Sequence, residues 1–313
     1  MRVAVVVGLL ALVAWLPAET AGTRDGAPPA EGGSLEVIDG AGRQVRVPAR
    51  PGRIVSLAPS VTEILFALGA GDRVVGVTDF CSYPAEAATR VRIGGLINPD
   101  LERIVSLKPD LAIATTTGNY LADAERIERL GVPVYTISTP TLESVLSTLA
   151  RVGDLLQAGD EARRLVSHLR DRIERVRGAG AGREPLRTLF VIEPDPLIAP
   201  GPGTFIGEAL AAAGAILVTG RAGSGWAQFD MEQVLRLEPE LLLTPEPNRA
   251  WSEGLARAAR WQRVPAVPAG HVFVISDAIQ HPGPRLVDGI EEVAAIVEKV
   301  RTARRSEPVQ ARP

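Results

Sequence analysis

The sequence predicts an α/β protein in which two related lobes, each built on a central sheet of parallel type, are joined by a long connector helix and enclose a ligand cleft. Short β-rich runs alternate with helical patterns along most of the 313 residues, which suffice for two medium domains. A wholly helical stretch separates two such regions, and a segment of the first recurs in the second. These observations predict the class, because single helices between strands favour parallel pairing.

The composition excludes several classes of function. With 46% hydrophobic residues and a formal net charge of -3, the chain is neither largely disordered nor suited to nucleic acid, whose phosphates require a basic excess. The single cysteine, Cys81, excludes an intramolecular disulfide and a cysteine-cluster metal site, and three histidines offer little for a histidine-rich one. We therefore expect no resident metal or cofactor.

The first residues predict export. Met1-Arg2 precede an apolar run over residues 3–16, and Ala18 is a small residue at a plausible cleavage site, so residues 1–18 are predicted to be a cleaved signal peptide. An uncleaved anchor is the alternative, but the run is shorter than the ~20 residues of a spanning helix. No cysteine follows for lipid attachment, which indicates a periplasmic protein. Residues 19–33, rich in Gly, Pro and Ala, are expected to be a flexible leader.

The N-terminal lobe is predicted over residues 34–140. It begins with a hairpin that turns at Asp39-Gly40. Ser60 with Glu63 forms a capping-box pattern, which predicts a helix over residues 61–68. The remaining elements alternate as strands at 53–57, 73–78, 111–115 and 132–137 and helices at 100–107 and 121–130.

Residues 141–182 are predicted to form a helical connector, because apolar residues recur there at spacings of three and four. A break at Gly159-Asp160 divides it into two helices, the second of about 18 residues by its periodicity. A glycine-rich run at 178–182 predicts a flexible boundary. The C-terminal lobe then covers residues 183–302, and residues 303–313 are expected to be a disordered tail. The elements expected in this lobe are strands at 186–192, 241–244 and 272–276 and helices at 204–213, 230–237, 253–260 and 284–300.

Two sequence elements recur in the same order in both lobes. The segment from Asp100 to Leu111 matches the segment from Asp230 to Leu241, with five identical positions and four close substitutions among twelve. Residues 62–70 likewise match residues 207–215. The second lobe is therefore interpreted as a duplicate of the first. A cleft between two such lobes is a favoured ligand site.

Four ordered motifs carry a family resemblance: Arg-Ile-Val-Ser-Leu-Ala-Pro-Ser-Val-Thr-Glu (53–63), Val-Gly-Val-Thr-Asp-Phe-Cys-Ser-Tyr-Pro (75–84), Gly-Gly-Leu-Ile-Asn-Pro-Asp-Leu-Glu (94–102) and Leu-Lys-Pro-Asp-Leu (107–111). They resemble the helical-backbone (class III) periplasmic substrate-binding proteins of ABC importers, most of all the cobalamin-binding branch. The resemblance covers most of residues 34–300. It implies a monomeric, non-enzymatic receptor that captures cobalamin or a related corrinoid and delivers it to an inner-membrane permease dimer. Contact with the membrane is then expected only through the transporter.

The few aromatic residues near the predicted sheet edges are the first candidate ligand contacts. Phe80 and Tyr83 follow a predicted strand at its carboxyl end, where α/β sheets bind ligands. Trp226 lies just before the helix expected to begin near residue 230. Aromatic faces on opposite sides of a cleft suit a large planar ring system. The alternative is that these side chains anchor the core or the loops.

The loop over residues 277–285 supplies the polar candidates, because it leaves the carboxyl end of a predicted strand. Asp277 and Gln280 are expected to hydrogen-bond the amide side groups of a corrin ring. His281 approaches the cobalt or, as we expect, makes a polar contact at the rim. Alternatively, Asp277 and Arg285 form a structural ion pair within the lobe. In the resembling family this loop borders the ligand. The residues of the loop that we predict to contact it are Asp277, Ala278, Ile279, Gln280, His281 and Arg285.

Glu102 and Glu232 occupy matching positions of the repeat, two residues after Asp100 and Asp230, which are placed as helix N-caps. One acidic side chain per lobe suits a two-fold symmetric permease. In the resembling family, glutamates at these motif positions pair with permease arginines, so Glu102 and Glu232 are predicted to dock on the transporter. The alternative is that both merely complement the helix dipole.

Two other functions compete with the corrinoid receptor. Haem and iron-siderophore receptors share the family framework, but neither Tyr120 nor Tyr135 is clearly placed as a haem ligand, and the expected cleft loops carry few Arg or Lys. An exported enzyme on the same scaffold is disfavoured, since the sequence shows no nucleophile elbow and no histidine near Cys81.

Overall fold

The computed structural model describes residues 33–306, which belong to one compact unit. The predicted signal peptide, the predicted leader up to residue 32 and residues 307–313 lie outside the described residues. Among the helices of the described part, none combines the length and the apolar character that crossing a membrane requires.

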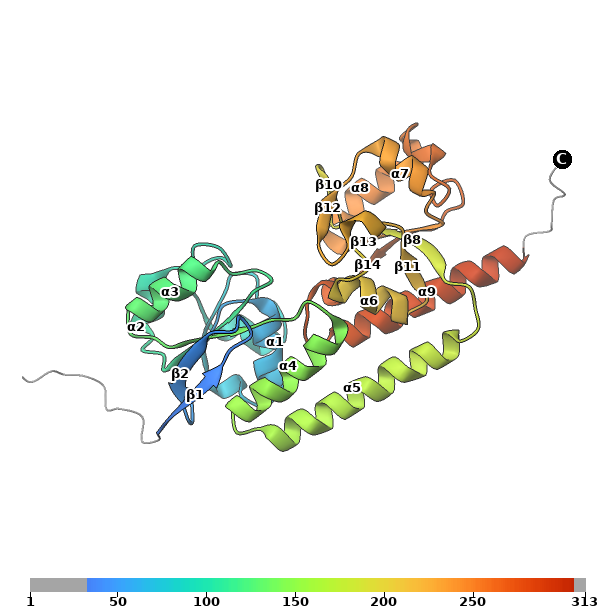
Figure 1. The fold of residues 1–313 in the computed structure, drawn as a ribbon. Helices are drawn as coiled ribbons and strands as arrows, with labels where there is room; N and C mark the ends of the chain where they lie inside the picture. The colour runs from blue at the N-terminus through green and yellow to red at the C-terminus, as the bar shows by residue number, and fades with distance from the viewer. Residues whose placement is uncertain (1–32, 307–313) are drawn as a thin grey trace, which may run out of the picture. The chain divides into compact units, whose positions relative to one another are not determined.

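The N-terminal lobe is built on a parallel sheet (Figure 1). From edge to edge its strands are β5 (Val91–Arg92), β4 (Val74–Val77), β3 (Ile54–Ser56), β6 (Leu111–Thr115) and β7 (Val134–Ile137). The helices that connect them are α1 (Pro59–Ala67), α2 (Leu101–Ser106) and α3 (Leu121–Arg129). Strands β3, β6 and β7 are buried along their whole length, as expected for a parallel sheet covered on both faces. The predicted alternation of strand and helix is confirmed here.

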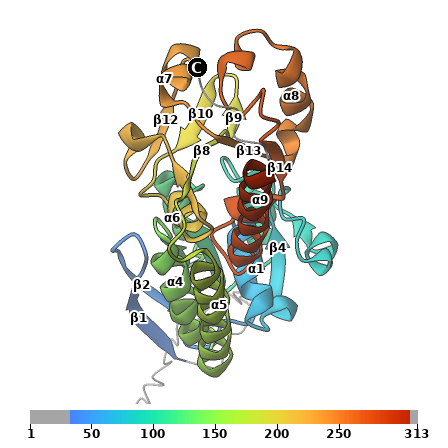
Figure 2. The same ribbon diagram turned by 90° about the vertical axis from the view of Figure 1, so that its right-hand side faces the viewer.

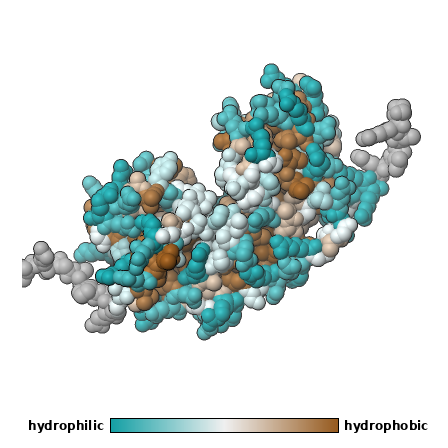
Figure 3. All heavy atoms as spheres, viewed as in Figure 1, coloured by the Kyte–Doolittle hydropathy of each residue, from teal (hydrophilic) through white to brown (hydrophobic). Residues whose placement is uncertain are grey.

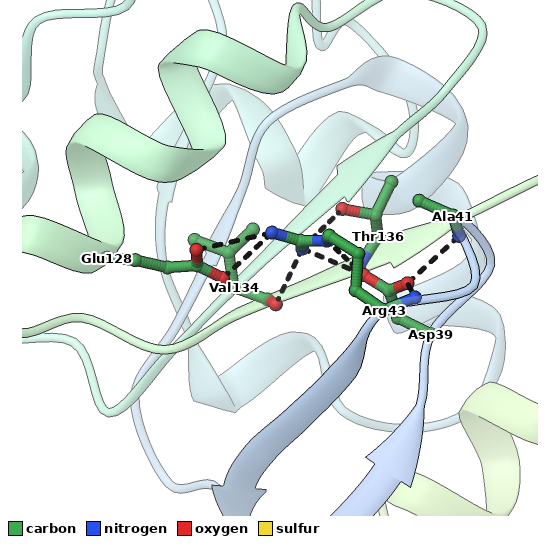
Figure 4. Close-up of polar contacts among 6 residues, drawn as sticks. All are labelled: Asp39, Ala41, Arg43, Glu128, Val134 and Thr136. Atoms are coloured by element: carbon green, nitrogen blue, oxygen red, sulfur yellow. Dashed lines mark hydrogen bonds and ion pairs between the residues drawn. The ribbon is translucent and has the colours of Figure 1, made fainter.

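The predicted hairpin is also confirmed, and its turn is tied to the lobe by charge (Figure 4). Strands β1 (Ser34–Ile38) and β2 (Gln44–Pro48) pair antiparallel. The buried Asp39 carboxylate accepts a hydrogen bond of 2.8 Å from the Arg43 guanidinium. Arg43 also donates to Glu128 on α3 and to Thr136 on β7, so one side chain attaches the hairpin to the sheet edge.

The C-terminal lobe repeats the plan with a second parallel sheet, in the order β11-β8-β13-β14. Its strands are β8 (Leu186–Phe190), β11 (Ala215–Leu217), β13 (Leu241–Pro245) and β14 (Val272–Ile275). Its helices are α6 (Phe205–Ala212), α7 (Met231–Leu237) and α8 (Arg249–Gly254). Helix α8 begins four residues before the predicted start of 253 and ends at Gly254, a residue of low helix propensity.

A small antiparallel ribbon in this lobe is absent from the sequence prediction. It consists of β9 (Glu193–Pro194), β10 (Leu197–Pro200) and β12 (Trp226–Gln228). These strands have two to four residues and two of them contain proline, so neither length nor residue type marks them as strands.

The duplication of the lobes extends to their hydrogen bonds. Asp100 caps α2 by accepting from the backbone N–H of Arg103 at 2.9 Å, and Asp230 caps α7 by accepting from Gln233 at 2.8 Å. Just after these helices, Lys108 and Glu238 both adopt left-handed φ values, of 46° and 43°, immediately before a proline. A helix capped and ended in the same way therefore precedes a buried strand in each lobe.

Three helices join the lobes, and they lie side by side in Figure 2. They are α4 (Leu142–Leu155), α5 (Gly159–Gly180) and α9 (Leu286–Ser306). The predicted break at Gly159 is confirmed, but α5 runs through Gly178, because no tertiary contact requires it to stop there. Helix α9 covers residues 303–306, which the sequence assigned to the tail. One cluster of buried apolar residues runs from the N-terminal lobe through α4 and α5 to α6 and α9.

The capping box predicted at Ser60 and Glu63 is wrong. Helix α1 begins at Pro59 after Ala58, and no side chain caps it. Both Ser60 and Glu63 are buried. The Glu63 carboxylate is used instead for a contact with the other lobe.

Candidate functional site

Figure 3 shows a hollow between the two lobes. The strands of each central sheet pair in parallel, so their carboxyl ends lie together at one edge of that sheet. In open α/β sheets these ends carry the loops that bind ligands. The loops that matter here are those after β4, β5 and β6 in the N-terminal lobe, and the ribbon and the loop after β14 in the C-terminal lobe.

Large apolar side chains are exposed on the N-terminal side. Phe80, which follows β4, is 62% exposed, and Tyr83 from the same loop is also exposed. The loops after β5 and β6 add three more exposed side chains, Ile97, Tyr120 and Leu121. Exposed apolar residues gathered at one sheet edge mark a binding surface. Ile97 and Leu121 were missed in the sequence, and Tyr120 was weighed only as a haem ligand. Ile97 belongs to the family motif at 94–102, but that motif does not distinguish a ligand wall from a turn, and none of the four motifs covers Tyr120 and Leu121.

Trp226 forms the aromatic part of the opposite side. It is the first residue of β12, is paired with Pro200 of β10, and is 45% exposed. The ribbon thus holds the indole at a defined place on the surface. The other described tryptophans, Trp251 and Trp261, are half-buried, pack edge-to-face on each other with centroids 5.3 Å apart, and pack against the core of the lobe.

The loop over residues 277–285 divides into buried and accessible candidates. Ala278 and Ile279 are buried, so their side chains belong to the core. Gln280 is half-buried, and its side chain forms no hydrogen bond with the described residues. Asp277 forms ion pairs with His281 and Arg285. His281 and Arg285 also contact a residue of the other lobe.

That residue is Glu63 of α1, whose side chain is 2% exposed and contacts both His281 and Arg285. Its Oε1 accepts a hydrogen bond of 2.7 Å from Nη2 of Arg285, and Nδ1 of His281 lies 3.3 Å from the same oxygen. Arg285 also donates to Oδ1 of Asp277 at 3.2 Å. Its guanidinium stacks over the Tyr83 ring, 4.2 Å from the centroid. We call these five residues the inter-lobe bridge.

The bridge keeps Arg285 charged. Burial by itself lowers the pKa of this guanidinium, but the hydrogen bond and charge of Glu63, together with Asp277, raise the pKa above its usual value. The ion pair proposed as the alternative for Asp277 and Arg285 is present, and it extends beyond one lobe to Glu63. Tyr83 therefore lies between the exposed aromatic surface and a buried contact that joins the lobes.

A cavity of about 570 Å³ adjoins the bridge on its connector side. Residues of α1, of α5 and of the first turn of α9 line it, together with Tyr83 and Arg285. Phe80 and Trp226 are not among the residues that line it, so it is distinct from the exposed aromatic surface.

Glu102 and Glu232 lie in the first turns of α2 and α7 and are exposed. Glu232 forms an ion pair with Arg236 on the same helix. The side chain of Glu102 forms no ion pair or hydrogen bond with the other described residues. The predicted N-caps beside them, Asp100 and Asp230, are confirmed.

Residues 33–306 contain no group of three or more His, Cys, Asp or Glu side chains that would hold a metal ion. Cys81 is fully buried, and its sulfur lies 3.1 Å from the hydroxyls of Thr62 and Thr78. This thiol is therefore part of a buried polar network beneath the loop that carries Phe80.

Comparison with known proteins identifies relatives over most of the chain. Residues 54–278 match the periplasmic binding protein family. A vitamin B12-binding protein of Vibrio parahaemolyticus is 29% identical over 254 residues, which cover 80% of this chain and 91% of the relative. An uncharacterized ABC transporter substrate-binding lipoprotein of Bacillus subtilis is 32% identical over 273 residues, 83% of this chain and 84% of the relative.

Solved structures share the fold. The periplasmic vitamin B12 binding protein of Vibrio cholerae superposes with a TM-score of 0.70 at 26% identity, covering 80% of this chain and 98% of that one. A periplasmic heme-binding protein from Roseiflexus superposes with a TM-score of 0.72, also at 26% identity, covering 79% of this chain and 98% of that one. The two-sheet fold with its long C-terminal helix is common to both.

The inter-lobe bridge generates the first prediction. Arg285→Ala leaves the buried Glu63 carboxylate without its guanidinium, and we expect the free energy of unfolding of the ligand-free protein to fall by about 3–5 kcal/mol. Arg236→Ala, which removes the exposed partner of Glu232, is the matched control and should leave the free energy of unfolding almost unchanged. Urea denaturation followed by circular dichroism measures both.

A double replacement separates charge burial from packing. Glu63→Leu with Arg285→Met leaves no buried charge at the bridge, so it should destabilise the protein less than Arg285→Ala alone. If Arg285→Ala lowers the free energy of unfolding no more than Arg236→Ala does, the bridge contributes nothing to stability.

Proposed function

Because the chain belongs to the periplasmic binding protein family, we propose that it captures cobalamin or a related corrinoid between its lobes and delivers it to an inner-membrane ABC importer. The family consists of non-enzymatic binding proteins. One observation carries the choice of ligand: exposed aromatic and aliphatic side chains stand at the edges of both lobes, with Phe80 on one side and Trp226 on the other. A corrin ring is large and mostly apolar on its faces, and such surfaces bind it by burial.

The charges at these edges support an uncharged ligand. Arg92 donates to the carbonyls of Thr78 and Cys81, and Arg221 donates to the carbonyl of Gln228. Arg285 is engaged by the inter-lobe bridge. With these guanidinium groups bound to protein oxygens, the edges offer little to the carboxylates of an anionic siderophore, which charged donors recognise. The amide groups of a corrinoid need hydrogen-bonding partners, a role we assign to the Gln280 amide, which both donates and accepts, and to the Asp277 carboxylate, which accepts from amide N–H groups.

Haem is the second candidate, and Tyr120 favours it. This tyrosine is 59% exposed at the end of the loop after β6, and a tyrosine side chain is a known axial ligand of haem iron. The fold shared with a heme-binding protein points in the same direction. Haem carries two propionates, however, and the engaged arginines make this candidate the weaker one.

Ligand binding tests the choice. The protein from residue 19 onward, expressed without the predicted signal peptide, should bind cyanocobalamin with 1:1 stoichiometry in isothermal titration calorimetry. It should bind haemin and a ferric siderophore more weakly. Mass spectrometry of the protein as purified from the periplasm identifies what it carries. Tight haemin binding without a response to cyanocobalamin overturns the corrinoid proposal and selects haem.

Trp226→Ala should weaken binding of the corrinoid by about 1–3 kcal/mol, because a buried aromatic contact with the ring is lost. Without ligand, the stability of the variant should stay near that of the wild type, since the indole is exposed there. Trp261→Ala is the control, because it removes a half-buried tryptophan that packs on Trp251 and the core, and it should lower stability while affinity survives. The reverse pattern for Trp226→Ala, lost stability with unchanged affinity, contradicts a ligand contact.

We further propose that Glu102 and Glu232 dock the two lobes on the two halves of the permease. They stand at equivalent exposed positions of the duplicated lobes, and neither is required as a helix cap. Equivalent charges on two lobes match paired basic sites on a symmetric partner.

Glu102→Ala and Glu232→Ala should leave ligand affinity intact and reduce uptake by the cognate importer in proteoliposomes, the double variant most. Glu174→Ala on α5 removes an equally exposed ion-paired glutamate and should leave uptake unchanged. Normal uptake in the double variant would leave only the helix-dipole role for both residues.

A further inference from the structure

A half-buried asparagine lies just beyond one strand at the carboxyl edge of each central sheet, at positions that differ by one residue in the repeat that aligns Leu111 with Leu241. In the N-terminal lobe, Asn119 follows β6 by four residues. Its Oδ1 accepts from the backbone N–H of Thr115 at 2.9 Å. Its Nδ2 donates to the carbonyls of Leu57 and Leu96, both at 2.9 Å. One amide therefore joins the chain after β3, the loop after β5 and the end of β6.

Asn248 is the counterpart in the C-terminal lobe, four residues after Thr244 of β13. Its Nδ2 donates to the carbonyl of Ile192 at 2.8 Å and to the Thr244 hydroxyl at 3.0 Å. The Thr244 hydroxyl donates in turn to the carbonyl of Val191 at 2.8 Å. The end of β8 is thus tied to the loop after β13, as the end of β3 is tied to the loop after β6.

The segments held by these amides carry the exposed side chains of the candidate site. Leu96 directly precedes Ile97, and Asn119 directly precedes Tyr120. On the other side, Ile192 leads into β9 and β10, and β10 pairs with the strand that begins at Trp226. Each asparagine therefore supports one wall of the hollow.

We infer that Asn119 and Asn248 are a pair of positioning residues that fix the two opposing ligand walls, Asn119 for Ile97 and Tyr120, and Asn248 for Trp226. The inference rests on the proposed function for its ligand. An asparagine is suited to this role because one side chain offers both a carbonyl acceptor and two N–H donors. Neither amide touches the ligand surface itself in this arrangement; each acts through the loop it holds.

A ligand-free experiment tests the positioning directly. Asn119→Ala should speed amide hydrogen exchange at residues 96–98 and 120–121 and leave residues 192–200 and 226–228 as in the wild type. Asn248→Ala should give the opposite pattern, so each variant is the control for the other. Asn119→Asp keeps the acceptor for Thr115 but lacks both donors, and it should reproduce the faster exchange at residues 96–98 even if the alanine variant folds poorly.

Affinity for cyanocobalamin tests the consequence for binding. Each alanine variant should weaken binding by about tenfold, the size expected from loss of a typical hydrogen-bonding group. In a double-mutant cycle, the effect of Asn119→Ala should largely vanish in a Tyr120→Ala background and persist in a Trp226→Ala background, and the effect of Asn248→Ala should do the reverse.

The outcomes separate this inference from the proposed function. Unchanged exchange at both sets of loops overturns the positioning role whatever the ligand is. Effects on affinity that add fully in every background also overturn it, because they indicate a general loss of stability. If the wild type binds haemin and not cyanocobalamin, the corrinoid proposal fails, and the same cycles with haemin decide the positioning role.

Discussion

The buried contact between Glu63 and Arg285 is the constraint on which the arrangement of the site depends. A carboxylate at 2% exposure is stable only when it is paired and hydrogen-bonded, and the guanidinium that pairs with it comes from the other lobe. The same guanidinium binds Asp277 and stacks on Tyr83. The position of the loop after β14 is therefore linked to that of the loop after β4, and a continuous apolar core through α4, α5 and α9 supports the link from behind.

Duplication explains how one chain makes two facing walls. Each lobe uses a helix with an aspartate cap, a left-handed residue before proline, a buried central strand, and an asparagine that gathers the loops beyond it. The lobes differ in what they place on that common frame. The N-terminal lobe exposes side chains that follow β4, β5 and β6, whereas the C-terminal lobe adds the antiparallel ribbon and exposes Trp226 from it.

The candidate site shows where local patterns mislead. Ser60 and Glu63 have the spacing of a capping box, yet both are buried, and Glu63 meets a residue 222 positions away in the chain. Ala278 and Ile279 lie in the loop that the family resemblance assigns to the ligand, but their side chains face the core. Ile97 lies in the family motif at 94–102, whereas Tyr120 and Leu121 lie at the start of α3 without a recognisable motif. The exposure of these three side chains is visible only in the folded lobe.

The sequence by itself determined the α/β class, the connector helices with their break at Gly159, the duplicated segment with its capping aspartates, and the resemblance to the binding-protein family. These features depend on local periodicity, turn chemistry and short motifs, which a linear pattern records. Only the tertiary structure decided the partners of Glu63 and Arg285, the ribbon that presents Trp226, and the loops held by Asn119 and Asn248. These are contacts between distant segments, and their energy comes from desolvation and pairing that arise only when the chain is folded.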